Sequence, residues 1–188
     1  MKKFELTSEF ITNIFGTKLF RIKALIEFGN VKAGELGGFT EKEENLSQDG
    51  NAWVYDNARV YGDACVCGDA RVYDNARVYG NAWVYGDACV CGDACVYGDA
   101  CVCGDARVCG DACVYGDAGY ATVHGFGSEY RTTTFFKTKA GDIGVKCGCF
   151  YGNLSEFRKK VVETHGETKK AKEYLMLADL MEFRLTHK

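Results

Sequence analysis

Residues 50–117 read GNAWVYDNARVYGDACVCGDARVYDNARVYGNAWVYGDACVCGDACVYGDACVCGDARVCGDACVYGD, which is one six-residue pattern repeated without interruption. In each hexad the third residue is alanine and the fifth is valine, so both point to the same side of an extended chain. The first two residues are Gly-Asp, Asp-Asn or Gly-Asn, which turn the chain at little cost. Each hexad therefore predicts a short strand and a corner. Because no single strand can bury its Ala-Val side alone, the repeat predicts stacked coils.

The repeat resembles that of the hexapeptide-repeat left-handed parallel β-helix proteins, because each valine is followed four residues later by an alanine. In that family three hexads make one triangular coil. The resemblance implies a mainly β protein built on a left-handed parallel β-helix, that is, a triangular solenoid. The left-handed winding is implied by the resemblance alone, because crossover connections between parallel strands are otherwise right-handed. Two packed sheets of hairpins are disfavoured, because corners every six residues leave strands too short for hairpins.

With three hexads per coil, every third hexad lies on the same face, with strands about 4.8 Å apart. The fourth and sixth residues of the hexads are then expected to form outward columns. The first face carries Tyr61, Tyr79, Tyr97 and Tyr115 beside Arg59, Arg77, Cys95 and Cys113. The second carries Trp53, Arg71, Cys89 and Arg107 beside Tyr55, Tyr73, Cys91 and Cys109. The third carries Cys65, Trp83 and Cys101 beside Cys67, Tyr85 and Cys103.

The segments that flank the repeat predict a cap at each end. Residues 1–49 are expected to form an N-terminal β cap and lead-in, residues 50–121 the solenoid, and residues 122–188 a C-terminal α+β cap. Alternating apolar residues predict strands over 4–10 and 17–28, which cover the open end of the first coil. In the lead-in, Leu36 and Leu46 are expected to point inward, and the charge run between them predicts a solvated loop.

The C-terminal segment predicts two strands, over 130–139 and 142–150, followed by two helices. The first helix begins after Asn153, with Glu156 completing a capping box, and ends at Gly166. The second runs from about 168 to 186. Its predicted buried stripe consists of Tyr174, Leu177, Met181 and Leu185.

Both flanking segments carry a second resemblance. The stretch FRIKALIEFGNVKAGELGGFTEKEENLSQDGNAWVY is similar to the start of YdcK-type bacterial solenoid proteins. The strings GSEYRTTTFF, GCFYG, LSEFRKKVVETHG and AKEYL resemble a C-terminal module of phage, prophage and Firmicute solenoid proteins. The resemblance implies the fold and a bacterial or phage setting, and no activity comes with it.

Charge is distributed unevenly along the chain. The overall net charge is −3. Residues 50–118 hold ten Asp and four Arg, a net charge of −6, whereas the segment from Gly119 carries +4. An acidic solenoid repels a phosphate backbone, so extended nucleic-acid binding along it is not expected. No apolar run is long enough to span a membrane and no signal peptide is recognisable, so a cytoplasmic protein is expected. Its 11 cysteines are expected to be reduced, with the nine of the repeat on outward positions.

One candidate ligand site lies where the solenoid is expected to meet the C-terminal cap. Hydroxyl groups and an arginine suit a phosphate or a carboxylate, and the alternative is a solvated strand face. His165 is a further candidate contact, with capping of the first helix as its alternative. The candidate residues are Ser128, Arg131, Thr132, Thr133, Thr134 and His165.

A second candidate is the tyrosine face, a long and flat strip that could bind another chain. The alternative is a ladder that only stabilises stacking. The residues of this candidate face are Tyr61, Tyr79, Tyr97, Tyr115, Arg59 and Arg77.

Metal and acyltransferase chemistry are weaker hypotheses. Cys147, Cys149 and His165 could start a zinc site, but a closed site needs four ligands, so packing of the thiols is preferred and neither metal nor cofactor is expected. The best-known hexapeptide-repeat proteins are acyltransferases with a catalytic histidine, yet none of the three histidines lies in a regular coil. The sequence thus predicts a non-enzymatic scaffold that binds another copy of itself or a host protein. A small-anion binder is the first alternative and an acyltransferase relative the second.

Overall fold

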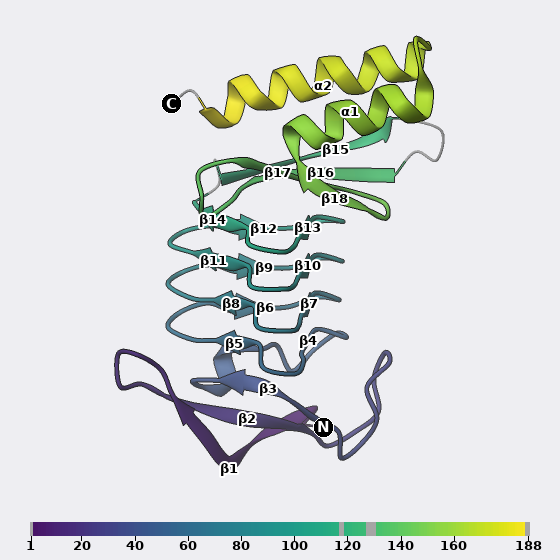
Figure 1. The fold of residues 1–188 in the computed structure, drawn as a ribbon. Coiled ribbons are helices and arrows are strands. Elements are labelled where there is room, and N and C mark those ends of the chain that lie inside the picture. The colour runs from purple at the N-terminus through teal and green to yellow at the C-terminus, as the bar shows by residue number, and fades with distance from the viewer. Residues whose placement is uncertain (1, 117–118, 127–130, 187–188) are drawn as a thin grey trace.

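The computed structural model describes residues 2–116, 119–126 and 131–186. Figure 1 shows a stack of coils with strands β1 to β3 at one end and a sheet with two helices at the other. The predicted β-solenoid is therefore confirmed. Left-handed winding, which the resemblance implies, stays a prediction.

Each coil of the solenoid has three faces, and strands 18 residues apart pair in parallel within the described part of the chain. The tyrosine face consists of β5 (Arg59–Val60), β8 (Arg77–Val78), β11 (Cys95–Tyr97) and β14 (Cys113–Tyr115). The second face consists of β4 (Trp53–Val54), β7 (Arg71–Val72), β10 (Cys89–Val90) and β13 (Arg107–Val108). The third consists of β6 (Cys65–Val66), β9 (Trp83–Val84) and β12 (Cys101–Val102). The predicted columns are thus confirmed.

The interior of the solenoid is formed by the repeated alanines and valines. From Ala52 to Val114, the valine and alanine of every hexad are at most 1% exposed. Burial of each valine side chain contributes about 1.5–3 kcal/mol to the stability of the fold. These short strands are therefore stabilised by packing between the coils. The predicted inward orientation is confirmed.

The corners place their first residue in the left-handed region of backbone conformation. Gly80 has a φ of +72°, and a Cβ there would lie 3.0 Å from the backbone nitrogen of Gly98 in the next coil. Glycine is favoured for both reasons. Asp56 and Asp74, which begin DNARVY hexads, adopt φ values of +51° and +61° at the same corner position.

The N-terminal strands continue the sheet of the tyrosine face. β1 (Phe4–Thr12) pairs antiparallel with β2 (Lys18–Ala24), and β2 pairs with β3 (Leu36–Thr40), which lies parallel to β5. Phe4 and Phe28 pack edge-on against the Trp53 ring, with centroids 6.1 and 5.3 Å away. Trp53 was expected to face outward but is 0% exposed, because these rings cover the first coil.

The lead-in already forms an irregular coil. Leu46 is 1% exposed and bridges Val66 in parallel, as predicted, whereas Leu36 is 51% exposed, so its predicted inward position is wrong. The charge run includes the short 3-10 helix η1 (Glu43–Asn45) and is not simply a solvated loop. Asn45 is buried and its side-chain amide donates hydrogen bonds to the carbonyls of Gly62 (3.0 Å) and Ala64 (2.8 Å).

A four-stranded antiparallel sheet follows the last coil, in the described residues. Its strands are β15 (Tyr120–Phe126), β16 (Arg131–Lys137), β17 (Ile143–Cys147) and β18 (Phe150–Asn153). The single strand predicted over 142–150 is wrong, because a turn with Gly148 at φ +56° divides it. Phe136 belongs to the solenoid core and its neighbour Phe135 to the core beneath the helices. The sheet therefore closes the solenoid with one side and supports the helices with the other.

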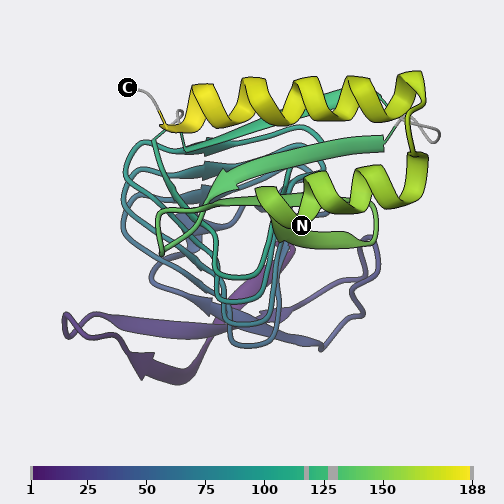
Figure 2. The ribbon, with the colours of Figure 1, turned by 45° about the horizontal axis from the view of Figure 1, so that its top comes forward.

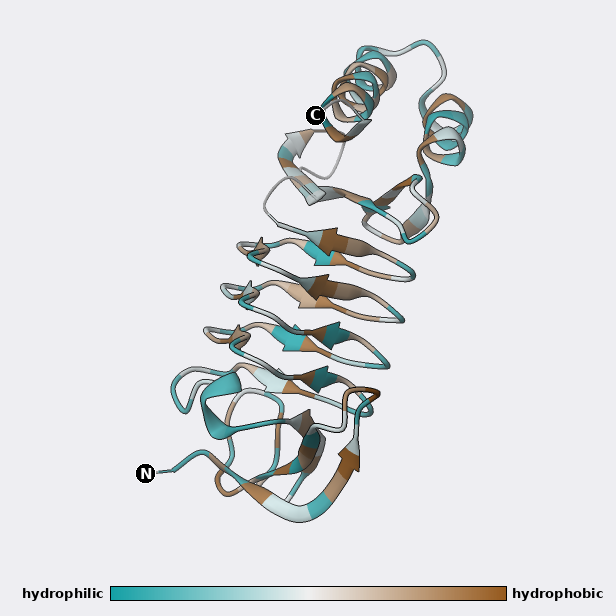
Figure 3. Ribbon diagram, turned by 90° about the vertical axis from the view of Figure 1, so that its left-hand side faces the viewer, coloured by the Kyte–Doolittle hydropathy of each residue, from teal (hydrophilic) through white to brown (hydrophobic). Residues whose placement is uncertain are grey.

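The two helices cover the outer side of this sheet (Figures 1 and 2). α1 (Leu154–His165) begins with the predicted capping box of Asn153 and Glu156, and α2 spans Lys169–Thr186. The four predicted stripe residues of α2 are all buried. In Figure 3, both helices are seen beyond the sheet, on the side away from the coils. Neither helix combines the length and the apolar character needed to cross a membrane, in the ranges that the structure describes.

Candidate functional site

A cavity of about 400 Å³ lies where the last coil meets the C-terminal sheet. Its lining residues are Asp105, Arg107, His124, Arg131, Thr132 and Gly148. Arg107 begins β13 of the solenoid, whereas His124 lies on β15 and Arg131 on β16. The solenoid and the C-terminal sheet therefore both contribute to one site, which we call the junction cavity.

Hydrogen bonds fix the sheet on the last coil. The backbone N–H of Arg107 donates to Thr134 Oγ1 at 3.0 Å. The Tyr151 hydroxyl donates to the carboxylate of Asp111 at 2.9 Å, and the Lys139 backbone N–H donates to the Asp111 carbonyl at 3.2 Å. The side chains that line the junction cavity therefore stand on joined strands, which preorganises them for a ligand.

The side chains on β15 and β16 are positioned by close local contacts. His124 Nδ1 lies 3.1 Å from Thr132 Oγ1 on the neighbouring strand. A Cβ at position 148 would lie 2.8 Å from a terminal nitrogen of Arg131. Glycine at position 148 therefore leaves room for the Arg131 guanidinium beside the β17–β18 turn.

The junction cavity brings two permanent positive charges together. Arginine side chains are always charged in proteins, and Asp105 is the carboxylate residue among those that line the cavity. This local excess of positive charge contrasts with the net charge of −6 of residues 50–118. The guanidinium of an arginine can donate two parallel hydrogen bonds to one phosphate or carboxylate, so the cavity is suited to an anion.

A groove of about 510 Å³ adjoins the junction cavity and shares Arg107 with it. It is lined by Tyr55, Asp56, Arg71, Tyr73, Cys89 and Arg107. Arg71, Cys89 and Arg107 pair in register, which places the two arginines two strand spacings, about 10 Å, apart. The groove offers two phenol rings next to the cationic cavity, a combination that suits an anion with an aromatic or apolar part.

The ligand residues predicted from the sequence lie in different places in the structure. Arg131 and Thr132 line the junction cavity. Thr133 and Thr134 are buried, where Thr133 Oγ1 donates to Cys147 Sγ at 3.1 Å and Thr134 holds β13. His165 stacks on Tyr174, with ring centroids 5.9 Å apart, and does not line the cavity. Ser128 lies outside the described residues.

Sequence reasoning missed Arg107 and His124 as members of this site. Arg107 was predicted only as one member of an outward column. The strand of Arg107 contacts β16 because this strand belongs to the last coil. The sequence of the hexad does not indicate that position. His124 was expected only to lie outside the regular coils, and the structure places it on a hairpin strand in which Val123 pairs with Thr133. Predicting that hairpin would have placed His124 opposite Thr132.

The candidate tyrosine face forms a stacked ladder. The rings of Tyr61 and Tyr79 are 5.0 Å apart and 1° from parallel, and those of Tyr79 and Tyr97 are 5.1 Å apart and 7° from parallel. Tyr115 is tilted by 47° against Tyr97 and is 66% exposed. Burial raises the pKa of the Tyr61 and Tyr79 phenols. The first three rings thus cover one another, and the last ring presents most of its surface.

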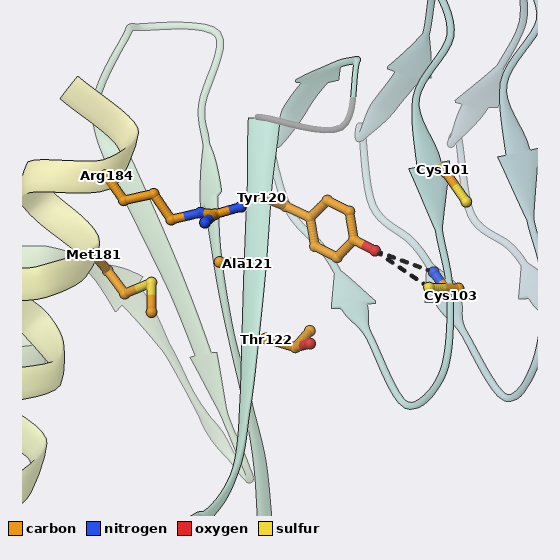
Figure 4. A pocket seen from close by; sticks show the side chains of 7 residues that line it. All are labelled: Cys101, Cys103, Tyr120, Ala121, Thr122, Met181 and Arg184. Carbon is orange, nitrogen blue, oxygen red and sulfur yellow. Dashed lines mark hydrogen bonds between the residues drawn. The ribbon is translucent and has the colours of Figure 1, made fainter. Parts of the chain in front are cut away.

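A second cavity, of about 470 Å³, lies on the α2 side of the last coil. Figure 4 shows Arg184 and Met181 of α2 on one side and Cys101 and Cys103 on the other. The Tyr120 hydroxyl accepts a hydrogen bond from the Cys103 N–H at 3.3 Å, which caps the third face of the solenoid. Arg184 is the cation among the residues that line this cavity, so it is less suited to an anion than the junction cavity.

The residues considered for zinc are not gathered into a site. Cys147 Sγ lies 3.9 Å from the Tyr174 hydroxyl, and Cys149 is exposed. Over the part of the chain described by the structure, no three His, Cys, Asp or Glu residues come together in a way that could hold a metal ion.

Comparison with known proteins agrees with the repeat architecture. The model of the YdcK β-solenoid repeat matches residues 52–68 and 70–86. A protein from Escherichia coli (strain K12), named "Uncharacterized acetyltransferase YdcK", is 40% identical over 63 residues, which are 30% of this chain. The matched region is only 19% of that relative's length. The chain is therefore similar to YdcK in its repeats, and it is a β-solenoid protein whose first coils carry the YdcK-type repeat.

Proposed function

We propose that this chain is a non-enzymatic binding protein, in which the solenoid and the C-terminal sheet together hold a small organic anion. The observation that carries the proposal is the approach of Arg107 and Arg131, from two parts of the chain, to one cavity. Charge-assisted hydrogen bonds from guanidinium groups are among the strongest in proteins. His124 and Thr132 provide further polar groups for a phosphate or carboxylate.

The adjoining groove supports an anion larger than inorganic phosphate. Tyr55 and Tyr73 lie beside Arg71 in the groove that shares Arg107 with the junction cavity. An aromatic ring of the ligand could pack against the phenols while its acidic group lies between Arg107 and Arg131. Mononucleotides and aromatic carboxylates fit this description.

Replacement of Arg107 by glutamine is expected to weaken anion binding about 10- to 100-fold, because a hydrogen bond to a charged group contributes about 1.5–3 kcal/mol. A thermal-shift screen of inorganic phosphate, nucleotides and dicarboxylates identifies the ligand, and calorimetry measures its affinity. Arg131→Ala is expected to have an effect of similar size.

Arg77→Gln is the matched control, because Arg77 occupies the same place in its hexad but lies on the tyrosine face. It is expected to leave the affinity unchanged. Equal affinities of the wild-type protein and the Arg107→Gln variant would contradict the assigned site.

Self-association through the tyrosine face is a second candidate, and the 66% exposure of Tyr115 favours it. Tyr115→Asp is then expected to shift a concentration-dependent oligomer to monomer in analytical ultracentrifugation. Tyr85→Asp, at an exposed tyrosine on the third face, is expected to leave the oligomer intact. A protein that is monomeric at every concentration would contradict self-association through the tyrosine face, and so would equal effects of the two variants. Neither result bears on the anion site.

Acetyl transfer, as in the name of the Escherichia coli relative, is the weakest candidate because the match covers so little of that protein. Acetyl-CoA belongs in the same screen. Its binding with release of free CoA in the presence of amine or hydroxyl acceptors would favour an enzyme over a binder.

A further inference from the structure

Two pairs of cysteines each have one member in the coil of β10 to β12 and the other in the coil of β13 and β14. Cys95 pairs in register with Cys113. The Cys91 N–H donates to the Val108 carbonyl at 2.9 Å, which places Cys91 beside Cys109 in the same parallel ladder. Adjacent strands lie about 4.8 Å apart, within the Cα separation of roughly 4.4–6.8 Å that a disulfide requires. All four cysteines are free thiols in the structure.

The two pairs differ in what their sulfur atoms contact. Cys91 and Cys109 lie close enough for each thiol to shift the pKa of the other, and the Tyr73 hydroxyl also acts on Cys91. In the other pair the sulfur atoms face different groups. Cys95 Sγ lies 3.9 Å from the Asp93 carbonyl, and Cys113 Sγ lies 3.4 Å from the Tyr97 hydroxyl. The thiols of the first pair therefore act on each other, whereas the sulfur atoms of the second pair contact other groups.

The surroundings of the first pair favour a thiolate on Cys91. The hydrogen bond from Cys109 and, to a smaller extent, that from Tyr73 lower the pKa of Cys91 to about 7, with a contribution from the Lys146 cation. Burial and the Asp74 carboxylate act in the opposite direction. The same hydrogen bond and burial raise the pKa of Cys109, which keeps its proton. At neutral pH a substantial fraction of Cys91 is thus a nucleophile beside a protonated thiol.

A small oxidant has a route to this pair. The sequence predicted all cysteines of the repeat on outward positions, yet Cys91 and its neighbour Cys89 are each only 8% exposed. Cys89 and Tyr73, which neighbour Cys91, line the 510 Å³ groove, and Cys109 is partly exposed. Such a position admits a peroxide more readily than a bulky reagent.

We infer that Cys91 is a peroxide-reactive thiol with Cys109 as its resolving partner, and that oxidation closes a disulfide between the last two coils. The Cys91 thiolate attacks one oxygen of hydrogen peroxide, the O–O bond breaks, and the sulfenic acid of Cys91 and hydroxide form. The Cys109 sulfur then attacks the Cys91 sulfur, the S–O bond breaks, and the Cys109 proton and the departing hydroxyl leave as water. In total, two thiols and one hydrogen peroxide give one disulfide and two waters.

Peptide mapping tests the inference, because an aspartate is the second residue of each of the hexads concerned. Cleavage before aspartate places Cys109 on DARVCG (105–110), which occurs once, and Cys95 and Cys113 on the two copies of DACVYG (93–98 and 111–116). Cys91 lies on DACVCG (87–92), a sequence that recurs at 63–68 and 99–104. The reduced full-length protein is treated with a small excess of hydrogen peroxide, alkylated and digested at acidic pH. A disulfide between peptides 87–92 and 105–110 is expected to form at least tenfold faster than one between 93–98 and 111–116. Loss of the first disulfide in the Cys91→Ser variant assigns it to Cys91, because the identical peptides 63–68 and 99–104 are unchanged and Cys89 is still present in that variant.

The pH dependence and two variants complete the test. The rate of Cys91 oxidation is expected to rise with pH to half its maximum near pH 7, because the thiolate is the reacting form. The Cys109→Ser variant is expected to trap the sulfenic acid of Cys91 as a dimedone adduct, whereas the matched Cys113→Ser variant still forms the Cys91–Cys109 disulfide. Equal oxidation rates of the two pairs, or no dimedone adduct in folded Cys109→Ser protein, would overturn the inference.

Discussion

Replacing Trp53 by alanine is expected to reduce the free energy of unfolding by about 3–5 kcal/mol, as for other fully buried large aromatic residues. The Trp53 ring is 0% exposed and packs against Phe4 and Phe28 at the base of the first coil. Removing it leaves a cavity between the N-terminal strands and the solenoid. Chemical denaturation followed by circular dichroism measures the loss.

The chain contains its own control for this prediction. Residues 50–55 and 80–85 are both GNAWVY, but Trp83 in the second copy is 54% exposed. Trp83→Ala is expected to reduce the free energy of unfolding by less than about 1 kcal/mol, as at other solvated positions. Since the chain has two tryptophans, the fluorescence of each variant reports the remaining one, and Trp53 is expected to emit at the shorter wavelength. Equal destabilisation by both substitutions would contradict the described burial.

A charge placed inside the solenoid is expected to have a still larger effect. Val72 is 0% exposed and lies between Val54 and Val90 in the inner ladder of the second face. Val72→Asp would bury an ionised carboxylate without a partner, which costs several kcal/mol or forces the group to take up a proton. We expect the free energy of unfolding to fall by more than about 4 kcal/mol, which is enough to unfold a domain of ordinary stability.

Arg71→Asp is the matched control for Val72→Asp. Arg71 precedes Val72 in the same strand, but its side chain is exposed on the outer face. This variant is expected to keep the far-ultraviolet spectrum and the unfolding midpoint close to those of the wild-type protein. A folded Val72→Asp protein of unchanged stability would mean that the valine does not face the interior.

The repeat could be predicted from the sequence because each hexad carries the same signals. Alanine and valine two residues apart, followed by a corner dipeptide, indicate inward and outward positions for every coil. Columns such as Tyr61, Tyr79 and Tyr97 then follow from simple counting once three hexads form a coil. The capping box at Asn153 was equally local and was also confirmed.

What surrounds each hexad could not be predicted in this way. The identical copies around Trp53 and Trp83 differ in burial only because Phe4 and Phe28 cover the first of them. Arg107 lines the junction cavity because its coil is the last one, not because its hexad is unusual. The turn at Gly148, which makes room for Arg131, lies inside a segment whose apolar residues predicted a continuous strand.

We propose that Arg107 and Arg131 together bind an anion where the solenoid meets the C-terminal sheet. Crystals of the wild-type protein soaked in tungstate, a tetrahedral dianion with a strong anomalous signal, test this proposal. An anomalous peak is expected within hydrogen-bond distance of both guanidinium groups, and no such peak is expected in the Arg107→Gln variant. An empty junction cavity in wild-type crystals that bind tungstate elsewhere would contradict it.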